Sequence, residues 1–276
     1  DLRLEGGRLR FTAPPGSARR FWIAADAGWE TPHALPLAPT GLRGPLAAEM
    51  VVIGPAELLA PLTPLVAARR RMGLRLQRVE LQDVYNEFSG GEKSPHALRA
   101  FLRQAAGRGG RPLRYALLVG AATLDPRGYR LPAAADVLPA YTVGTRVMEC
   151  PSDDWYGDLN EDGLPEVVVG RLPVTEAGQV AALLPKLLQT PAAQPSAVVA
   201  ADDDNGYAFR EAARDLAALP PLRGRTQLVA AQPQAPEQGR ADLQQAWSQG
   251  PSFLAYMGHG SVGAWAGNLL DRDTVE

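Results

Sequence analysis

Hydrophobic and polar positions follow two patterns along the chain, and the change between them falls near residue 45. Residues 1–45 contain short alternating runs broken by Pro and Gly, which indicates the last strands of a β-rich region followed by an extended linker. From residue 49 onward, short apolar runs alternate with longer amphipathic runs. They predict strands at 49–54, 75–81, 114–122, 165–174, 197–200, 226–231 and 252–260, and helices at 61–73, 94–110, 175–190, 207–220 and 237–250.

This alternation indicates βαβ units and therefore sheets that are mostly parallel. With 276 residues, 46% of them hydrophobic, the chain is long enough to bury the core of one large domain or of two small ones. Prolines cluster at 191–195, between the fourth and fifth predicted strands. We therefore expect an α/β fold in two parts, joined near this segment.

Charge and cysteine content exclude several classes of function. A net charge of -2 gives no indication of a nucleic-acid partner, and no run approaches the ~18 apolar residues of a membrane span. Cys150 is the only cysteine, so a disulfide within the chain is excluded, and with three dispersed histidines a zinc site is not expected. No P-loop or G-x-S-x-G motif follows a predicted strand.

Polar clusters follow three of the predicted strands at the point where each strand ends. "GAATLDP" follows 114–119, "ADDDNG" follows 197–200 and "GHGS" follows 252–257. Ligands of open α/β sheets bind at the carboxyl ends of the strands. These clusters are therefore the first candidates for a functional site.

His259, between Gly258 and Gly260, has two interpretations. In the first it fills a tight turn in which the glycines supply positive φ. In the second the glycines let the backbone approach a ligand. His259 is then an exposed acid or base, and the N–H groups that follow it are anion donors.

The acidic cluster Asp202–Asp204 also has two interpretations. It forms an Asx turn that caps the next helix, or one carboxylate orients His259 or binds a cationic substrate. If the strands before Asp202 and His259 are neighbours, both loops open on the same sheet edge.

A second acidic segment, 153–166, begins like a calcium loop. Residues 158–163 read D-x-N-x-D-G, but Val169 stands at the twelfth position, where an EF-hand needs an acid. The segment is either a hairpin turn held by Asx contacts or a Ca²⁺ site that takes further ligands from nearby. The candidate ligands are Asp153, Asp154, Asp158, Asn160, Asp162 and Glu166.

Together, "YMGHGSVGAWA" (256–266) and "DDWYGDLNEDGLPEVVVGRLPV" (153–174) resemble the gingipain family of bacterial cysteine peptidases, which are caspase-like in fold. "RYALLVGAATLDP" and "LPAY" support the resemblance, which covers roughly 45–276. It implies a three-layer α/β/α sandwich of two subdomains with mostly parallel sheets, preceded by a short β-rich segment. The implied boundaries are 1–45 for the preceding region, 46–192 for the first subdomain and 193–276 for the second.

The resemblance also implies roles for individual residues. His259 matches the histidine that pairs with a cysteine nucleophile, Gly260 N–H faces the oxyanion, and Asp202 orients His259, with Asp203 as the alternative. Trp265 matches an aromatic residue that edges the substrate pocket, although a lone Trp is more often core. An acid in the pocket gives relatives a preference for basic residues; Asp203 and Asp204 are candidates, and they equally suit a helix cap. Structural Ca²⁺ in such peptidases favours the calcium interpretation of 153–166.

The family's nucleophile lies beyond the next helix and strand, whereas this sequence ends 17 residues after His259. Cys150 precedes the acidic loop and does not match it. We therefore expect a peptidase domain whose remaining part, C-terminal to residue 276, supplies the cysteine, with peptides or proteins as substrates. The expected location is secreted or on a bacterial cell surface, as a processing peptidase of type IX secretion or as a digestive enzyme.

Two other classes stay open at this point. The chain is a non-catalytic binding or scaffold module that keeps the caspase-like fold, or a Ca²⁺-stabilised module that binds carbohydrate or protein through the 153–166 loop. A cysteine at a strand end after residue 276 separates the first of these from the peptidase.

Overall fold

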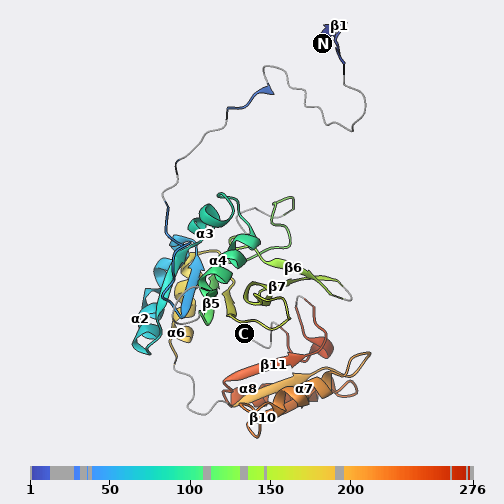
Figure 1. Ribbon diagram of the computed structural model, residues 1–276. Coiled ribbons are helices and arrows are strands. Elements are labelled where there is room, and N and C mark those ends of the chain that lie inside the picture. Colours follow the sequence, from blue (N-terminus) through green and yellow to red (C-terminus); the bar gives the residue numbers. More distant parts are fainter. Residues whose placement is uncertain are drawn as a thin grey trace.

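The computed structural model describes residues 2–12, 28–31, 36, 39–107, 113–130, 136–145, 148–189, 196–261, 263–271 and 273 (Figure 1). It begins with an antiparallel hairpin of β1 (Leu2–Glu5) and β2 (Arg8–Phe11). This hairpin matches the short β-rich segment that the sequence predicts. Most of the expected linker lies outside the described residues.

A first sheet contains four parallel strands in the order β4-β3-β5-β8. Its strands are β3 (Met50–Gly54), β4 (Leu76–Glu80), β5 (Tyr115–Val119) and β8 (Val168–Leu172). The helices that follow these strands are α1 (Ala56–Leu59), η2 (Ala60–Leu62), α2 (Thr63–Arg71), α3 (Leu81–Phe88), α4 (Pro95–Gly107) and α6 (Ala177–Leu187).

Alternating residues of β3 show that helices cover both faces of this sheet. Val51 and Ile53 are buried in a cluster with residues of α3 and α4. Val52 is buried in a second cluster, with residues of α1, α2 and α6. Successive side chains of a strand point to opposite faces. The predicted three-layer α/β/α arrangement is therefore confirmed for the first sheet.

A second sheet contains three parallel strands in the order β10-β9-β11. Its elements are β9 (Ala197–Ala201), α7 (Phe209–Ala218), β10 (Thr226–Ala230), α8 (Pro236–Ser248) and β11 (Phe253–Met257), followed by the short helix η4 (Ala266–Asn268). All five residues of β9 are buried. Val198 and Ala200 pack towards α8, whereas Val199 and Ala201 pack towards α7, so this sheet also lies between two helical layers.

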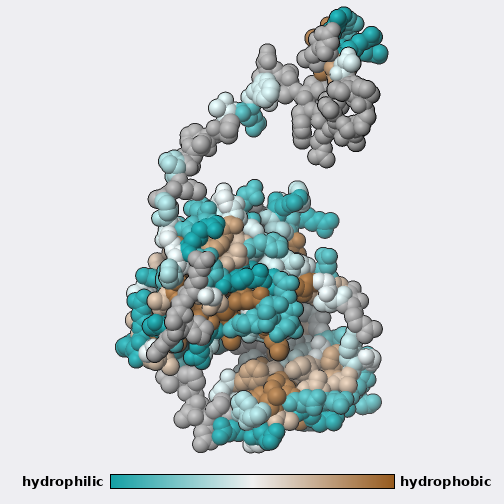
Figure 2. All heavy atoms as spheres, viewed as in Figure 1, coloured by the Kyte–Doolittle hydropathy of each residue, from teal (hydrophilic) through white to brown (hydrophobic). Residues whose placement is uncertain are grey.

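The two sheets lie in the two bodies of Figure 1, within 39–189 and 196–271. The proposed boundary near 192 falls in 190–195, outside the described residues, so the exact domain limits stay a prediction. In Figure 2, apolar surface is visible on the lower body near β11, and Phe253 of that strand is 44% exposed.

Several elements of the first body were not predicted, among them α1. Helix α3 begins directly after β4, and a hairpin of β6 (Tyr141–Gly144) and β7 (Glu149–Ser152) precedes the short helix α5 (Asp154–Gly157). The α3 sequence carries an amphipathic pattern, with Leu81, Val84 and Tyr85 buried, but the predicted strand 75–81 overlaps its start. The hairpin contains Pro151, which is unusual within a strand.

Arg171, at the end of β8, connects four segments of the first body. Its guanidinium donates to both carboxylate oxygens of Asp153 at 2.8 and 2.7 Å, and to the carbonyls of Gly120, Leu138 and Pro139 at 2.8, 2.8 and 3.2 Å. Only 11% of its side chain is exposed. A planar fork of five donors matches this set of acceptors, and a lysine does not.

We expect Arg171→Leu to lower the free energy of unfolding by about 3–5 kcal/mol, because it leaves a carboxylate and three carbonyls without their donor. Urea unfolding measures this change. Arg75→Leu is the matched control, since Arg75 pairs with Glu49 at 3.5 Å with 43% of its side chain exposed and should contribute less than about 1 kcal/mol. Equal effects of the two substitutions would contradict the role given to Arg171.

Candidate active site

Asp202 and His259 come together because their strands are neighbours. Ala201 and Met257, the last residues of β9 and β11, are paired in register, and Asp202 N–H donates to the Met257 carbonyl at 2.9 Å. The chain leaves β9 for β10 on one side and reaches β11 on the other. The site therefore lies at a switch point of the sheet, where α/β folds bind ligands.

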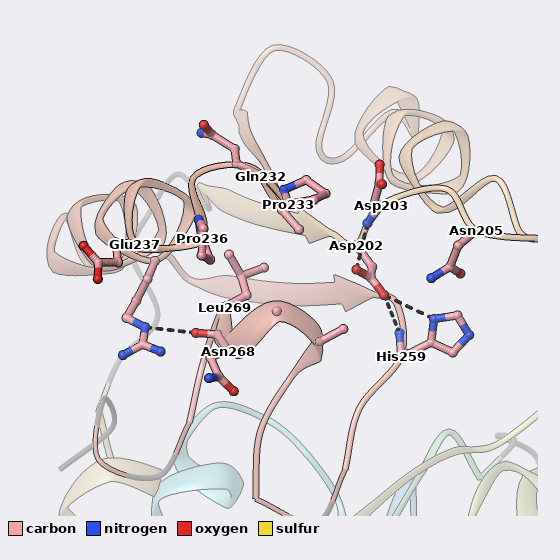
Figure 3. Close-up of a pocket in the computed structure, with 14 residues that line it drawn as sticks. Asp202, Asp203, Asn205, Gln232, Pro233, Pro236, Glu237, His259, Asn268 and Leu269 are labelled. Carbon is pink, nitrogen blue, oxygen red and sulfur yellow. Dashed lines mark hydrogen bonds and ion pairs between the residues drawn. The ribbon is translucent and has the colours of Figure 1, made fainter.

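The Asp202 carboxylate accepts three hydrogen bonds although its residue is only 5% exposed. Oδ2 lies 3.2 Å from both the backbone nitrogen and the ring Nδ1 of His259 (Figure 3). Oδ1 accepts from the Asp203 N–H at 2.8 Å. A buried carboxylate needs such donors to stay charged. The contact with His259 is the arrangement that the sequence predicts.

This contact defines what the imidazole does. A carboxylate accepts the Nδ1 proton, so Nε2 is left with its lone pair and is the atom that takes or returns a proton. Half of the His259 side chain is exposed, 50% against 7% for Asp202. The buried carboxylate of Asp202 thus holds the exposed imidazole of His259 through Nδ1.

Tyr256 and Gly258 shape the turn that carries His259. The Tyr256 hydroxyl donates to the His259 carbonyl at 2.8 Å and accepts from Ala266 N–H at 3.3 Å. A Cβ on Gly258 would lie 2.3 Å from that hydroxyl oxygen and 2.5 Å from Asp202 Cβ. Burial and then the charge of Asp202 raise the pKa of Tyr256, so its hydroxyl keeps the proton that it donates at neutral pH.

Gly260 follows His259 in a short antiparallel bridge with Trp265. Ser261 N–H donates to the Ala264 carbonyl at 2.8 Å, and Ala266 N–H donates to the His259 carbonyl at 2.9 Å. Gly260 N–H has no acceptor among the described residues. It is therefore available to an anion.

A cleft of about 1030 Å³ opens beside His259 at the carboxyl ends of β9 and β10. Asp203 lines it, but its carboxylate pairs with Arg210 at 2.9 Å. Asp204 accepts from the Arg210 backbone N–H at 3.0 Å, so it caps the first turn of α7. The lining residues are Asp202, Asp203, Asn205, Ala231, Gln232, Pro233, Pro236, Glu237, Arg240, His259, Ala266, Gly267, Asn268 and Leu269 (Figure 3).

Trp265 is not one of the residues that line this cleft. It stacks on Tyr256 with ring centroids 4.2 Å apart and packs against the apolar cluster between the second sheet and α8. Both Trp265 and Tyr256 therefore support the turn, and the sequence analysis did not identify Tyr256. The sequence signal for Tyr256 is its position two residues before Gly258, because its side chain packs over this glycine, which has no Cβ.

Five of the six predicted calcium ligands are engaged within the protein, and Asp154 is the exception. Asp153 is bound to Arg171, and Asp154 is exposed in the first turn of α5. The others accept backbone N–H groups: Asp158 from Glu161 and Gly163 at 2.7 and 3.1 Å, Asn160 from Asp162 at 2.9 Å, Asp162 from Leu164 at 2.9 Å, and Glu166 from Leu159 at 2.7 Å.

Arginines also cover the outer side of this loop. Arg99 donates to the Asp158 carbonyl and to Glu161, and Arg103 donates to the Leu159 carbonyl at 2.6 Å. Among the described residues, no three His, Cys, Asp or Glu side chains are grouped in a way that would hold a metal ion. In this arrangement the residues do not fit a calcium ion. The calcium site stays an untested prediction, and no step below depends on one.

Fold and site together define a class: α/β proteins in which a buried carboxylate holds an exposed histidine at the end of parallel strands, as in hydrolases that activate a nucleophile. The sequence model of Peptidase family C25 matches residues 44–276. The chain therefore belongs to the C25 family of cysteine peptidases, the family of the gingipains. No curated protein sequence matches the chain.

Solved structures agree on the fold. The Arg specific cysteine proteinase gingipain R (RgpB) matches with a TM-score of 0.57 and 20% identity, over 83% of this chain and 50% of that chain. The complex of Porphyromonas gingivalis RgpB pro- and mature domains gives 0.57 and 20%, over 82% and 51%. Dimeric latent PorU from the same organism gives 0.44 and 26%, over 52% and 16%. The chain thus spans about half the length of the RgpB chains that it matches.

We expect Gly258→Ala to lower the free energy of unfolding by about 1–3 kcal/mol, because the added methyl group collides with Asp202 and displaces the Tyr256 hydroxyl. Gly263→Ala is the control, since nothing lies within 4 Å of a Cβ there, and its effect should stay within about 0.5 kcal/mol. Thermal unfolding of both variants checks this. A neutral Gly258→Ala would contradict the close approach described for this turn.

For the acidic loop we expect the same melting temperature in calcium and in EDTA, because its carboxylates are already bonded to the backbone. Asp158→Ala should lower the free energy of unfolding by about 1–3 kcal/mol in either buffer, through loss of the acceptor for two N–H groups. Scanning calorimetry measures both. A melting temperature that rises with calcium, and does so only when Asp158 is present, would instead support the predicted calcium site.

Proposed function

We propose that this chain carries the acid–base half of a cysteine endopeptidase, with His259 as general base and acid. The observation that supports this most directly is the contact between buried Asp202 and the Nδ1 atom of exposed His259 in a chain of family C25. The nucleophile is a cysteine C-terminal to residue 276. Asp202 is a positioning residue, and Gly260 N–H binds the oxyanion.

In the proposed reaction, His259 Nε2 takes the proton of the cysteine thiol, and the thiolate attacks the carbonyl carbon of the scissile peptide bond. Negative charge then develops on the carbonyl oxygen, next to Gly260 N–H. The C–N bond breaks as His259 returns the proton to the leaving amine. Water activated by the same nitrogen then hydrolyses the thioester, which frees the thiol and the acid.

Cys150 is not proposed as the nucleophile. It lies on β7, where it is paired with Val143, and it is not among the residues that line the cleft beside His259. Its thiol is partly buried. The reaction therefore depends on a residue that this sequence does not contain.

Peptides and proteins are the proposed substrates, as the family implies. We also propose a secreted or cell-surface location, as the resemblance to the gingipains implies. Among the described residues, no helix has the length and apolar character needed to cross a membrane. Asp203 and Asp204 are already occupied by Arg210, so neither is proposed as the residue that selects a basic substrate.

We expect the full natural chain to cleave fluorogenic peptides in a reaction that iodoacetamide abolishes. His259→Ala should lower kcat/KM on the order of 10²–10⁴-fold, because the thiol loses its base. Asp202→Asn should lower kcat more than it raises KM, because it disturbs the tautomer of His259 and not the binding of the peptide. A peptide library with and without iodoacetamide measures all three.

His96→Ala is the matched histidine control. His96 lies on α4 against Tyr141 and Trp155, in the first body, and its loss should leave kcat/KM of the folded enzyme unchanged. If the wild-type chain cleaves nothing in the presence of reductant, the result favours the alternative function, a non-catalytic binding or scaffold module that retains the fold.

A further inference from the structure

Two aromatic side chains, which the proposed reaction does not use, stand against the ring of His259. Phe209 is the first residue of α7, and its ring centroid lies 5.0 Å from that of His259 with an interplanar angle of 84°. Tyr207 lies 6.2 Å from His259 and stacks against Phe209 at 5.5 Å and 30°. We call Tyr207 and Phe209 the aromatic shelf.

The shelf is apolar surface that remains open to solvent. Tyr207 is 47% exposed, whereas Phe209 is partly buried beneath it. Neither residue lines the cleft described above. His259 therefore contacts both the cleft and the aromatic shelf. The exposed ring of Tyr207, backed by Phe209, offers an apolar group a surface to pack against beside His259.

The segment that carries the shelf is held in place before any ligand arrives. Asp204 accepts from Arg210 N–H at 3.0 Å, and the Arg210 side chain bridges Asp203 at 2.9 Å and the Ala231 carbonyl at 3.0 Å. These contacts fix the segment 203–210 to β10 and to the start of α7. A preformed surface loses little entropy when it binds a partner.

From this geometry we infer that the aromatic shelf binds an aromatic or large aliphatic side chain of the peptide substrate, next to the scissile bond. This rests on the proposed function, because the base must lie at the bond that breaks. An extended peptide advances about 3.3 Å per residue, so a side chain one or two residues from that bond reaches rings centred 5.0 and 6.2 Å from His259. Aromatic pairs at such distances attract each other beyond simple burial.

The first experiment uses the full natural chain and fluorogenic peptides in which one position at a time, on either side of the cleaved bond, is Phe, Leu, Gly or Asp. At one position, Phe and Leu should exceed Gly in kcat/KM by roughly 10–100-fold. Tyr207→Ala should remove most of that preference through KM, and Tyr207→Phe should retain it. Tyr129→Ala is the control, because Tyr129 is 78% exposed and belongs to the first body.

The outcomes separate this inference from the proposed function. Cleavage that depends on His259 and on the thiol, but shows no apolar preference that Tyr207→Ala removes, overturns the shelf and leaves the peptidase proposal intact. A Tyr207→Ala chain that melts several degrees lower with unchanged preference also overturns it, since the shelf is then covered by another part of the protein.

A second measurement decides the inference without turnover. Fluorescence anisotropy follows the binding of labelled Phe-containing and Gly-containing hexapeptides to the full chain that carries His259→Ala. The Phe peptide should bind about 10-fold more tightly, and Tyr207→Ala in the same chain should abolish the difference. Equal binding of the two peptides overturns the shelf even if the chain cleaves nothing.

Discussion

One carboxylate oxygen of Asp202 binds both the backbone nitrogen and the ring Nδ1 of His259, and the rest of the site depends on this double contact. A carboxylate that is 5% exposed must keep its donors, because an uncompensated buried charge costs several kcal/mol. The same requirement fixes the backbone of the turn and the orientation of the imidazole. The same contact of Asp202 with His259 therefore stabilises the turn and orients the imidazole ring.

The order of the strands in the second sheet brings Asp202 and His259 together. β9 lies at the centre of the second sheet, buried on both faces, with β10 and β11 as its two neighbours. The loops after all three strands consequently open on one edge, where they supply Asp202, the cleft residues Gln232 and Pro233, and His259. Tyr256 and Trp265 then support the turn from below by stacking. The His259 side chain is half exposed, whereas Asp202 is buried and Tyr256 and Trp265 are partly buried.

Much of this could be predicted from the sequence, because the period of the apolar runs is strong where strands are buried. The seven predicted strands of the parallel sheets correspond to β3, β4, β5 and β8 to β11. A carboxylate beside His259 was one of two interpretations of the acidic cluster, and the resemblance implied that it is Asp202, which the structure places there. Helix α3 and the β6–β7 hairpin were missed, since local patterns there compete with a neighbouring strand and with Pro151. Tyr256 and the aromatic shelf were missed because only three-dimensional packing distinguishes them from core residues.

The acidic loop has a spacing that suits two interpretations, of which the calcium site stays an untested prediction. Asp158, Asn160 and Asp162 have the spacing of cation ligands, yet the same spacing suits a chain of Asx turns, and here their oxygens accept N–H groups of the loop itself. Arg99 and Arg103 of α4, which is far away in sequence, bind the loop, and Arg171 of the following strand β8 binds its flank at Asp153. No local sequence motif predicts these arginine contacts.

The central claim is that His259 Nε2 faces a cysteine while Asp202 holds Nδ1. The most direct test is a crystal structure of the full natural chain after alkylation by iodoacetamide. We expect a carboxamidomethyl group on a cysteine C-terminal to residue 276, with its sulfur roughly 3–4 Å from His259 Nε2 and Asp202 still bonded to Nδ1. An unmodified protein, or a modified cysteine far from His259, would contradict the proposed role of His259.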